Sequence, residues 1–93
     1  MRRIERSTRF RRDYKRELKG RYGATLDADF HLLLAALVTD APLEARLRDH
    51  ALTGALRGQR DCHIKPDLVL IYAKPDAGTL RLNRLGSHSD VFD

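Results

Sequence analysis

One short stretch of the chain is apolar at every position: Leu68-Val69-Leu70-Ile71-Tyr72. Pro66 stands before it, and the turn-forming residues 75–78 follow it. A short apolar run between turn signals is typical of a strand that is buried on both faces. The pattern therefore predicts a central strand over residues 68–73.

The residues just before this run alternate between apolar and polar side chains. Because strand side chains have a period of two, Cys62 and Ile64 share one face of such a strand. Asp61 and His63 share the other face. A strand over residues 59–64 that buries the first pair therefore presents an acid and an imidazole together on its open side.

A further strand is predicted over residues 79–85, where Leu80 and Leu82 alternate with polar side chains. Short turns join these strands, so we expect an antiparallel meander with the apolar strand in the middle. Strict alternation would bury Arg84 with the two leucines. We expect the alternation to lapse near the end of this strand, which would leave Arg84 on the open face.

The N-terminal half has helical periodicity instead. Ser7 or Thr8 is the expected N-cap of a first helix, whose apolar stripe recurs every four residues at Phe10, Tyr14 and Leu18. A glycine-containing loop leads to a second helix, which we expect Thr25 to cap. Its apolar stripe has the spacing of one helix face and comprises Leu26, Phe30, Leu33, Leu34 and Leu37. Consecutive helices joined by a short loop predict a helical hairpin.

Together these patterns predict a single α+β domain over residues 1–93. The N-terminal helical hairpin would pack on one face of a small antiparallel sheet and leave the other face open. A short edge strand is expected around Ile4, and one more helical turn within residues 43–47. Residues 48–58 and 86–93 show little periodicity, so we expect them to be irregular.

The chain has 93 residues and a formal net charge of +5, which is concentrated at one end. Residues 1–24 carry ten Lys/Arg against three acids, whereas residues 25–93 carry eight against ten. Such a basic segment favours a polyanion or an acidic protein as partner, with a solvated helix face as the alternative. The single cysteine excludes an internal disulfide, and no apolar run is long enough to span a membrane. We therefore expect a cytoplasmic protein.

Candidate chemistry gathers in the second half of the chain. Histidines stand at His50, His63 and His88, and charged residues accompany them at Asp61, Asp67, Arg60 and Arg84. Cleavage of RNA through its own 2′-hydroxyl needs a base, an acid and a cation for the phosphate. Imidazole and guanidinium groups suit these tasks without a metal. The residue types are therefore compatible with a metal-independent ribonuclease.

A zinc site is the rival use of the same side chains. The three histidines and Asp67 would supply four ligands. Their spacing matches no compact histidine motif for metal binding, so this use is disfavoured and no cofactor is expected. Cys62 falls on the predicted core face, where we expect a buried hydrophobe and not a nucleophile.

Four segments of the C-terminal half form a combined motif: Asp49-His50-Ala51-Leu52-Thr53-Gly54, Gly58-Gln59-Arg60-Asp61-Cys62-His63-Ile64-Lys65-Pro66-Asp67, Leu70-Ile71-Tyr72 and Arg84-Leu85-Gly86-Ser87-His88-Ser89-Asp90-Val91-Phe92. In this order, and nearly without gaps, they resemble the YafQ-type toxins of the RelE/ParE superfamily of bacterial toxin–antitoxin systems. The resemblance covers roughly residues 48–92. The residues before it match only in architecture.

The resemblance implies a ribosome-dependent mRNA endonuclease that a small acidic, DinJ-like antitoxin neutralises in a hetero-oligomer. The family's catalytic positions fall on His50, His63, Asp67 and His88. Supporting positions near the RNA fall on Asp61, Arg84 and Phe92, and Arg60 is a further candidate for RNA binding.

From these positions we expect His88 to be the general acid and His50 or His63 the base. Arg84 would meet the scissile phosphate. The remaining roles would be orientation of an imidazole by Asp61 or Asp67 and stacking of Phe92 on a base.

One position departs from the family pattern, because Leu68 stands where an aromatic residue commonly follows Pro66-Asp67. We therefore do not carry over a codon or base preference. The basic first helix is expected to bind ribosomal RNA or the antitoxin through Arg9, Arg11, Arg12, Lys15, Arg16 and Lys19. Two alternatives stay open: a ParE-type toxin that binds gyrase without cutting RNA, and a non-catalytic ribosome- or RNA-binding module.

Overall fold

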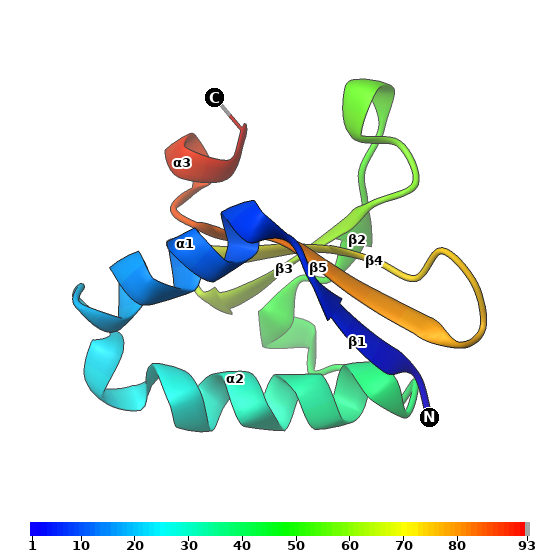
Figure 1. Cartoon of the computed structure of the whole chain (residues 1–93), viewed down its shortest axis with the longest axis horizontal. Helices are drawn as coiled ribbons and strands as arrows, with labels where there is room; N and C mark the ends of the chain where they lie inside the picture. The colour runs from blue at the N-terminus through cyan, green and yellow to red at the C-terminus, as the bar shows by residue number, and fades with distance from the viewer. Residues whose placement is uncertain (93) are drawn as a thin grey trace.

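The computed structural model describes residues 1–92 and contains a sheet with the strand order β1-β5-β4-β3-β2. The strands are β1 (Arg3–Arg6), β2 (His50–Ala51), β3 (Arg60–Lys65), β4 (Leu68–Ala73) and β5 (Thr79–Gly86). The helices are α1 (Thr8–Leu18), α2 (Gly23–Val38) and α3 (His88–Phe92), with 3₁₀ turns η1 (Ala45–Leu47) and η2 (Gly54–Leu56). Figure 1 shows α2 on one side of the sheet and α3 on the other, with α1 beside β5. The architecture is α+β, as predicted.

Every residue of β4 is buried, which confirms the predicted central strand enclosed on both faces. One face joins the main core with α1 and α2 through Leu68, Leu70 and Tyr72. The other face forms a smaller apolar cluster, which consists of Val69, Ile71, Leu52, Val91 and Phe92. The side opposite the helical hairpin is therefore not fully open, because α3 covers part of it.

The side chains of β3 alternate as predicted. Cys62 and Ile64 are 0% and 4% exposed in the main core, and burial raises the pKa of the Cys62 thiol to about 12. Asp61 and His63 lie on the other face. However, Asp61 is only 2% exposed, so the acid expected on an open surface is covered. The cause is β2, which lies beside this end of β3 and pairs His50 with Asp61.

The sheet is mixed, whereas an antiparallel sheet was expected. β1 runs parallel to β5, and the other three pairings are antiparallel. The predicted edge strand around Ile4 therefore exists, but its direction was not anticipated. A parallel pair needs a long connection, and here the helical hairpin and three of the strands lie between the two partners in sequence.

A bulge in β5 explains how Arg84 leaves the core face. Tyr72 pairs with Leu82 and Ile71 pairs with Arg84, so Asn83 is an extra residue on this strand. The alternation shifts by one, and both Leu82 and Leu85 face the main core. Arg84 shares the opposite face with Ile71. The bulge is the lapse of alternation that we expected near the end of this strand.

The two long helices begin in different ways. Ser7 caps α1 as predicted, since its Oγ accepts a hydrogen bond from the Phe10 N–H at 2.9 Å. α2 begins at Gly23, so the prediction that Thr25 caps it was wrong. A Cβ at Gly23 would lie 2.0 Å from the Leu18 carbonyl oxygen. Only glycine therefore lets α2 start directly against the end of α1.

The C-terminal half holds more regular structure than its periodicity indicated. η1 confirms the helical turn predicted within residues 43–47. The prediction of irregular chain over 48–58 and 86–93 was wrong within the described residues, because these segments form β2, η2 and α3. At the start of α3, Ser87 Oγ accepts from the Asp90 N–H at 3.1 Å and Asp90 Oδ2 accepts from the Ser87 N–H at 3.2 Å. This reciprocal cap has a sequence signature, a serine followed three residues later by an acid.

No helix among residues 1–92 is both long and apolar enough to cross a membrane.

The close contact at Gly23 gives a stability prediction. Gly23→Ala forces a Cβ against backbone, so we expect the free energy of unfolding to fall by about 1–3 kcal/mol, measured by denaturant titration. Gly20→Ala is the matched control, because its Cβ would meet nothing closer than 3.5 Å. Equal stabilities of the two variants would contradict this account of the helix start.

Candidate active site

Strand register brings most of the candidate side chains to the face of the sheet opposite α2. One row of cross-strand neighbours runs through His50, Asp61, Ile71 and Arg84. The next row runs through His63, Val69 and Gly86, and His88 follows shortly after. Because adjacent strands lie about 4.8 Å apart, the two rows cover roughly 10 to 15 Å across the sheet.

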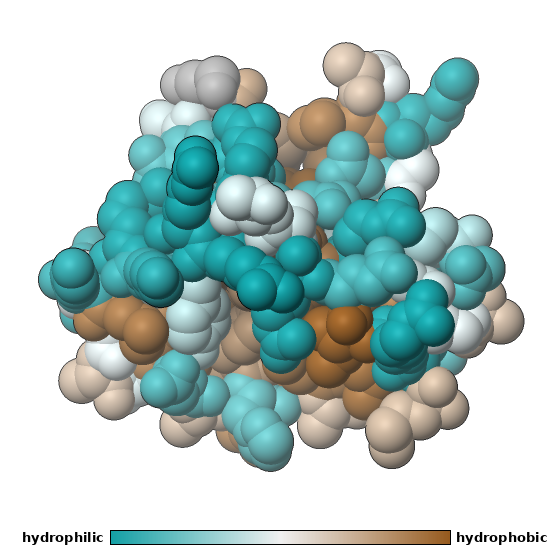
Figure 2. Space-filling view, viewed as in Figure 1, coloured by the Kyte–Doolittle hydropathy of each residue, from teal (hydrophilic) through white to brown (hydrophobic). Residues whose placement is uncertain are grey.

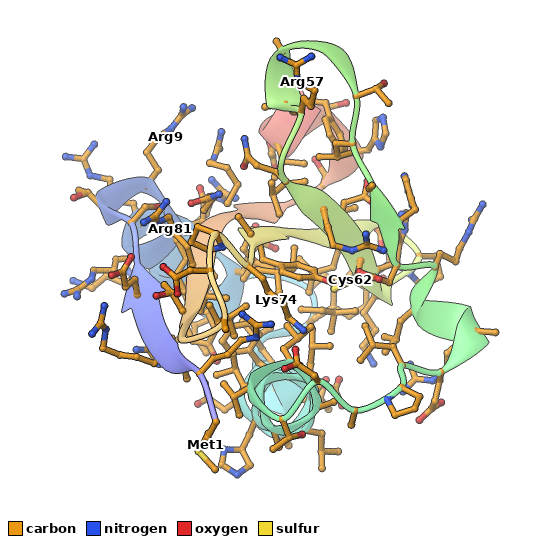
Figure 3. All side chains as sticks on the ribbon, turned by 90° about the vertical axis from the view of Figure 1, so that its right-hand side faces the viewer. Met1, Arg9, Arg57, Cys62, Lys74 and Arg81 are labelled. Carbon is orange, nitrogen blue, oxygen red and sulfur yellow. The ribbon has the colours of Figure 1, made fainter. Side chains whose placement is uncertain are left out.

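Two segments stand on this same side of the sheet. α3 rises from the end of β5, and the loop that contains η2 rises from β2 and β3 (Figure 1). In Figure 3, Arg57 marks the tip of this loop, on the side of the sheet away from α2, while Cys62 lies within the fold. The candidate residues therefore lie on a surface that these two segments flank.

His50 is held over the buried carboxylate of Asp61. Its Nδ1 lies 2.9 Å from the carbonyl oxygen of Arg48 and 2.9 Å from Oδ1 of Asp61. Both of these atoms are acceptors, so Nδ1 carries the proton and Nε2 is the basic nitrogen of the neutral ring. The proton points to Arg48, and Asp61 Oδ1 receives no hydrogen bond within residues 1–92. The imidazole is half exposed, and Nε2 is the nitrogen that can accept a proton.

His63 has the same tautomer for a similar reason. Its Nδ1 lies 3.3 Å from the carbonyl oxygen of Pro66, which can only accept a hydrogen bond. Nδ1 therefore donates, and Nε2 carries the lone pair. Both strand histidines thus offer a proton acceptor on the candidate face.

His88 and Phe92 lie one turn apart on α3. Their ring centroids are 4.5 Å apart, with 45° between the ring planes. Phe92 is half-buried against the apolar cluster on this face of β4, whereas the His88 side chain is exposed. Phe92 therefore fixes the imidazole from one side and leaves the other side to solvent.

Arg84 is fixed by a residue that sequence reasoning missed. Its Nε donates to Oδ2 of Asp13 at 2.8 Å, and its Nη2 donates to the carbonyl oxygen of Asp90 at 3.2 Å. Asp13 belongs to α1 and is 4% exposed. The only signal in the sequence is that Asp13 is an acid in a helix that is otherwise rich in basic residues.

Three other residues singled out in the sequence point elsewhere. Asp67 is exposed in the turn after β3, where it accepts hydrogen bonds from Tyr22 at 2.5 Å and from Arg21 at 3.0 Å. Arg60 pairs with Asp49 at 2.8 Å and stands opposite Tyr72, so it shares the core face of β3 with Cys62. Leu68 is 1% exposed in the main core, which leaves no side chain there for a base to stack on.

Two hollows of the structure lie away from the candidate histidines. A hollow of about 580 Å³ lies between α1 and α2, and another of about 410 Å³ lies between η1 and the β3–β4 pair. Neither is lined by His50, His63 or His88. Within residues 1–92, no three His, Cys, Asp or Glu side chains come close enough together to hold a metal ion.

A sequence-family model described as "Bacterial toxin of type II toxin-antitoxin system, YafQ" matches residues 2–93. The chain belongs to the YafQ family of bacterial toxins.

Similarity to individual members extends over the whole chain. The mRNA interferase toxin YafQ of Escherichia coli strain B / BL21-DE3 is 34% identical over 96% of this chain and 94% of its own length. In the crystal structure of the E. coli DinJ–YafQ complex, a chain is 33% identical, with a TM-score of 0.85 over 100% of both chains. A metal-bound toxin from Helicobacter pylori is 38% identical, with a TM-score of 0.82 over 99% of this chain and 100% of that one. The α+β fold of this chain is therefore the fold of solved YafQ structures.

In this YafQ-family chain, the contact between Tyr22 and Asp67 gives a pH prediction. The hydrogen bond from Tyr22 holds the pKa of Asp67 below its usual range. A depressed native pKa contributes stability that is present above the unfolded pKa of about 3.9 and is lost as pH falls through the native value. Tyr22→Phe is expected to raise the Asp67 pKa, measured by carboxyl-carbon NMR titration. The variant should therefore lose the part of the pH dependence of its stability that comes from Asp67.

Tyr14→Phe serves as the control, because the Tyr14 hydroxyl donates to Asp27 and not to Asp67. An Asp67 pKa that stays the same in Tyr22→Phe would show that the hydrogen bond is not its cause.

Proposed function

We propose that this chain is the toxin of a type II toxin–antitoxin pair and an mRNA interferase that cuts mRNA on the ribosome by metal-independent acid–base catalysis. The observation that carries the proposal is the pair of cross-strand rows, which gathers two histidines and an arginine on one face, with His88 shortly after the end of β5. Relatives that carry the name mRNA interferase toxin support the reaction class.

The proposed reaction uses the RNA's own 2′-hydroxyl as nucleophile. A base takes the 2′ proton, the 2′ oxygen attacks phosphorus, and the bond to the 5′ oxygen breaks as an acid gives that oxygen a proton. The base is Nε2 of His50 or of His63, since the Nδ1 proton of each ring is directed to a backbone carbonyl. His88 is the acid, because it is exposed at the far side of the same face.

Other residues support these groups. Arg84 stabilises the extra negative charge on phosphorus through the guanidinium nitrogen that points away from Asp13. Asp61 places its carboxylate 2.9 Å from Nδ1 of His50, where its negative charge stabilises the imidazolium that forms when the base takes the proton. Phe92, which is only partly buried against the apolar cluster, stacks on a base. Asp67 takes a supporting role at the turn next to His63, since Tyr22 and Arg21 already engage its carboxylate.

An open face suits this substrate better than a deep pocket would. A long mRNA strand has to lie across the site without threading through it, and α3 and the loop that contains η2 stand apart from one another on the same side of the sheet (Figure 1). The ribosome would hold the message extended and restrict which nucleotides reach His88.

The exposed side of α1 is the proposed contact surface for polyanions and for the antitoxin. Figure 2 shows hydrophilic side chains gathered over this helix. Within residues 1–92, no acidic side chain pairs with its exposed basic residues Arg9, Arg11, Arg12, Lys15 and Lys19, whereas Arg16 is turned inward to Asp13. The neighbouring hollow has an aromatic floor of Phe10, Tyr14 and Phe30 with Arg11 and Lys15 at its rim. An acidic antitoxin segment with apolar side chains fits this combination.

The test is cleavage of a defined, end-labelled mRNA on purified ribosomes, mapped by primer extension. His88→Ala is expected to slow cleavage by at least about 100-fold, because it removes the acid, and to leave antitoxin binding intact. His31→Ala is the matched control, since His31 is an exposed histidine of α2. Undiminished cleavage by His88→Ala would contradict the role of the acid. Growth arrest without any RNA cleavage by the wild type would favour a gyrase-binding toxin instead.

A further inference from the structure

We propose that Asp13 and Arg16, which face away from the exposed basic surface of α1, are positioning residues that hold Arg84 and the His88-bearing helix in place. The inference rests on the proposed function, because Arg84 and His88 are the groups it serves. It adds a part of the site that lies on α1 and does not touch RNA.

α1 takes the place of a strand along the second half of β5. β1 pairs with β5 only from Thr79 to Leu82. Beyond that point, Ser7 Oγ donates to the Asn83 carbonyl at 2.8 Å. Further along, Asp13 Oδ2 accepts from the Leu85 N–H at 2.9 Å, and Arg16 Nη2 donates to the Leu85 carbonyl at 2.9 Å. Side chains of one helix therefore satisfy the backbone groups that a neighbouring strand would otherwise pair.

The carboxylate of Asp13 joins two arginines at the centre of this contact. Its side chain is 5% exposed, and its oxygens accept from Arg84 Nε at 2.8 Å, Arg84 Nη2 at 3.4 Å and Arg16 Nη1 at 3.0 Å. A buried carboxylate is tolerated only when it is paired and hydrogen-bonded in this way. The two-point contact fixes the plane of the Arg84 guanidinium. Its Nη1 makes no hydrogen bond within residues 1–92 and is the nitrogen left for a phosphate.

Arg16 extends the network to α3. Its Nη2 lies 3.7 Å from Oδ2 of Asp90, the residue that caps α3 with Ser87. The guanidinium reaches this point by passing over Gly86, where a Cβ would lie 2.7 Å from Arg16 Nη2 and 2.9 Å from Asp90 Cβ. Arg84 contacts the same turn through the Asp90 carbonyl. α3, with His88 at its first position, is thus tied to α1 and β5 at its N-terminal end.

Three acids, Asp13, Asp90 and Glu17, surround the two arginines of this cluster, and Glu17 Oε2 lies 3.0 Å from Arg16 Nε. Loss of one member leaves a buried or half-buried charge without its partner, so the remaining side chains rearrange. Arg84 and α3 are then free to shift, and a displacement of about 1 Å at a reacting group lowers a rate by about a hundredfold. The effect falls on the chemical step and not on docking to the ribosome, because the Arg16 guanidinium is already engaged by Asp13 and Glu17 and by the Leu85 carbonyl. The proposed contact residues of α1 keep their charges, namely Arg9, Arg11, Arg12, Lys15 and Lys19.

The test compares Arg16→Gln with Arg46→Gln, an exposed arginine of η1 whose ion pair among the described residues is with the exposed Glu44. Single-turnover cleavage of ribosome-bound mRNA is expected to fall about tenfold to a hundredfold for Arg16→Gln, with ribosome affinity unchanged within about twofold. Arg46→Gln should keep the wild-type single-turnover rate, because Arg46 lies outside α1 and outside the proposed site. Equal single-turnover rates in the two variants would overturn the proposal.

A double-mutant cycle separates positioning from a general loss of stability. If Asp13 acts through Arg84, Asp13→Asn should slow cleavage strongly in the wild type but have little further effect in Arg84→Gln. If Asp13 is merely structural, Asp13→Asn should slow cleavage by the same factor in the wild type and in Arg84→Gln. That result would overturn the positioning role.

A spectroscopic arm of the test, hydrogen exchange at Arg84, does not depend on cleavage activity. The Arg84 Nε–H signal should be protected from exchange in the wild type and in Arg46→Gln, and should lose protection in Asp13→Asn. Protection that persists in Asp13→Asn would also contradict the proposal. If the wild type itself cuts no RNA, the proposed function fails, whereas this arm still reports whether Asp13 holds Arg84.

Discussion

The burial of β4 on both faces is the constraint on which the rest of the molecule depends. A slip of one residue would move Leu70 and Tyr72 out of the main core and replace them with the side chains of the opposite face. Because both faces are packed, neither β3 nor β5 can slide along this strand without loss of apolar burial. The positions of the polar side chains on the neighbouring strands are therefore a consequence of apolar packing in the middle of the sheet.

The bulge in β5 reconciles that packing with an arginine on the opposite face. Leu82 and Leu85 are separated by an odd number of positions, yet both side chains are 0% exposed in the same core. One extra residue between them makes this possible and turns Arg84 to the side of Ile71. Arg84 then meets Asp13 of α1, which also covers the edge of β5 that β1 leaves unpaired. A local irregularity thus links the core, the sheet edge and the candidate site.

The elements that were predicted correctly from the sequence are those set by short-range periodicity. Periodicity predicted the strands around Cys62 and Leu70 and the apolar stripes of the two long helices, because one repeating environment acts on each of them. It failed for β2, whose two residues are too few to show a period and whose partner is chosen by tertiary structure. It also failed for the start of α2, where a close backbone approach at Gly23 overrides the preference of Thr25 for a cap position.

The candidate site was predictable in part for the same reason. Alternation put Asp61 and His63 on one side of β3, but the cover over Asp61 comes from β2, a short strand that alternation cannot predict. Asp13 gave no usable signal, since an acid in a basic helix is ordinary until the fold places Leu85 and Arg84 beside it. Long-range pairing of this kind depends on the packed structure and not on any window of the sequence.

The short length of α3 affects how the molecule unfolds. A helix of five residues is not stable by itself, so its order depends on the Ser87–Asp90 cap and on the anchoring of Val91 and Phe92. Such a segment opens at a smaller free energy than the sheet does. Warming or mild denaturant will therefore release His88 while the strands stay paired, and the chain will pass through a population with α3 detached before the sheet unfolds.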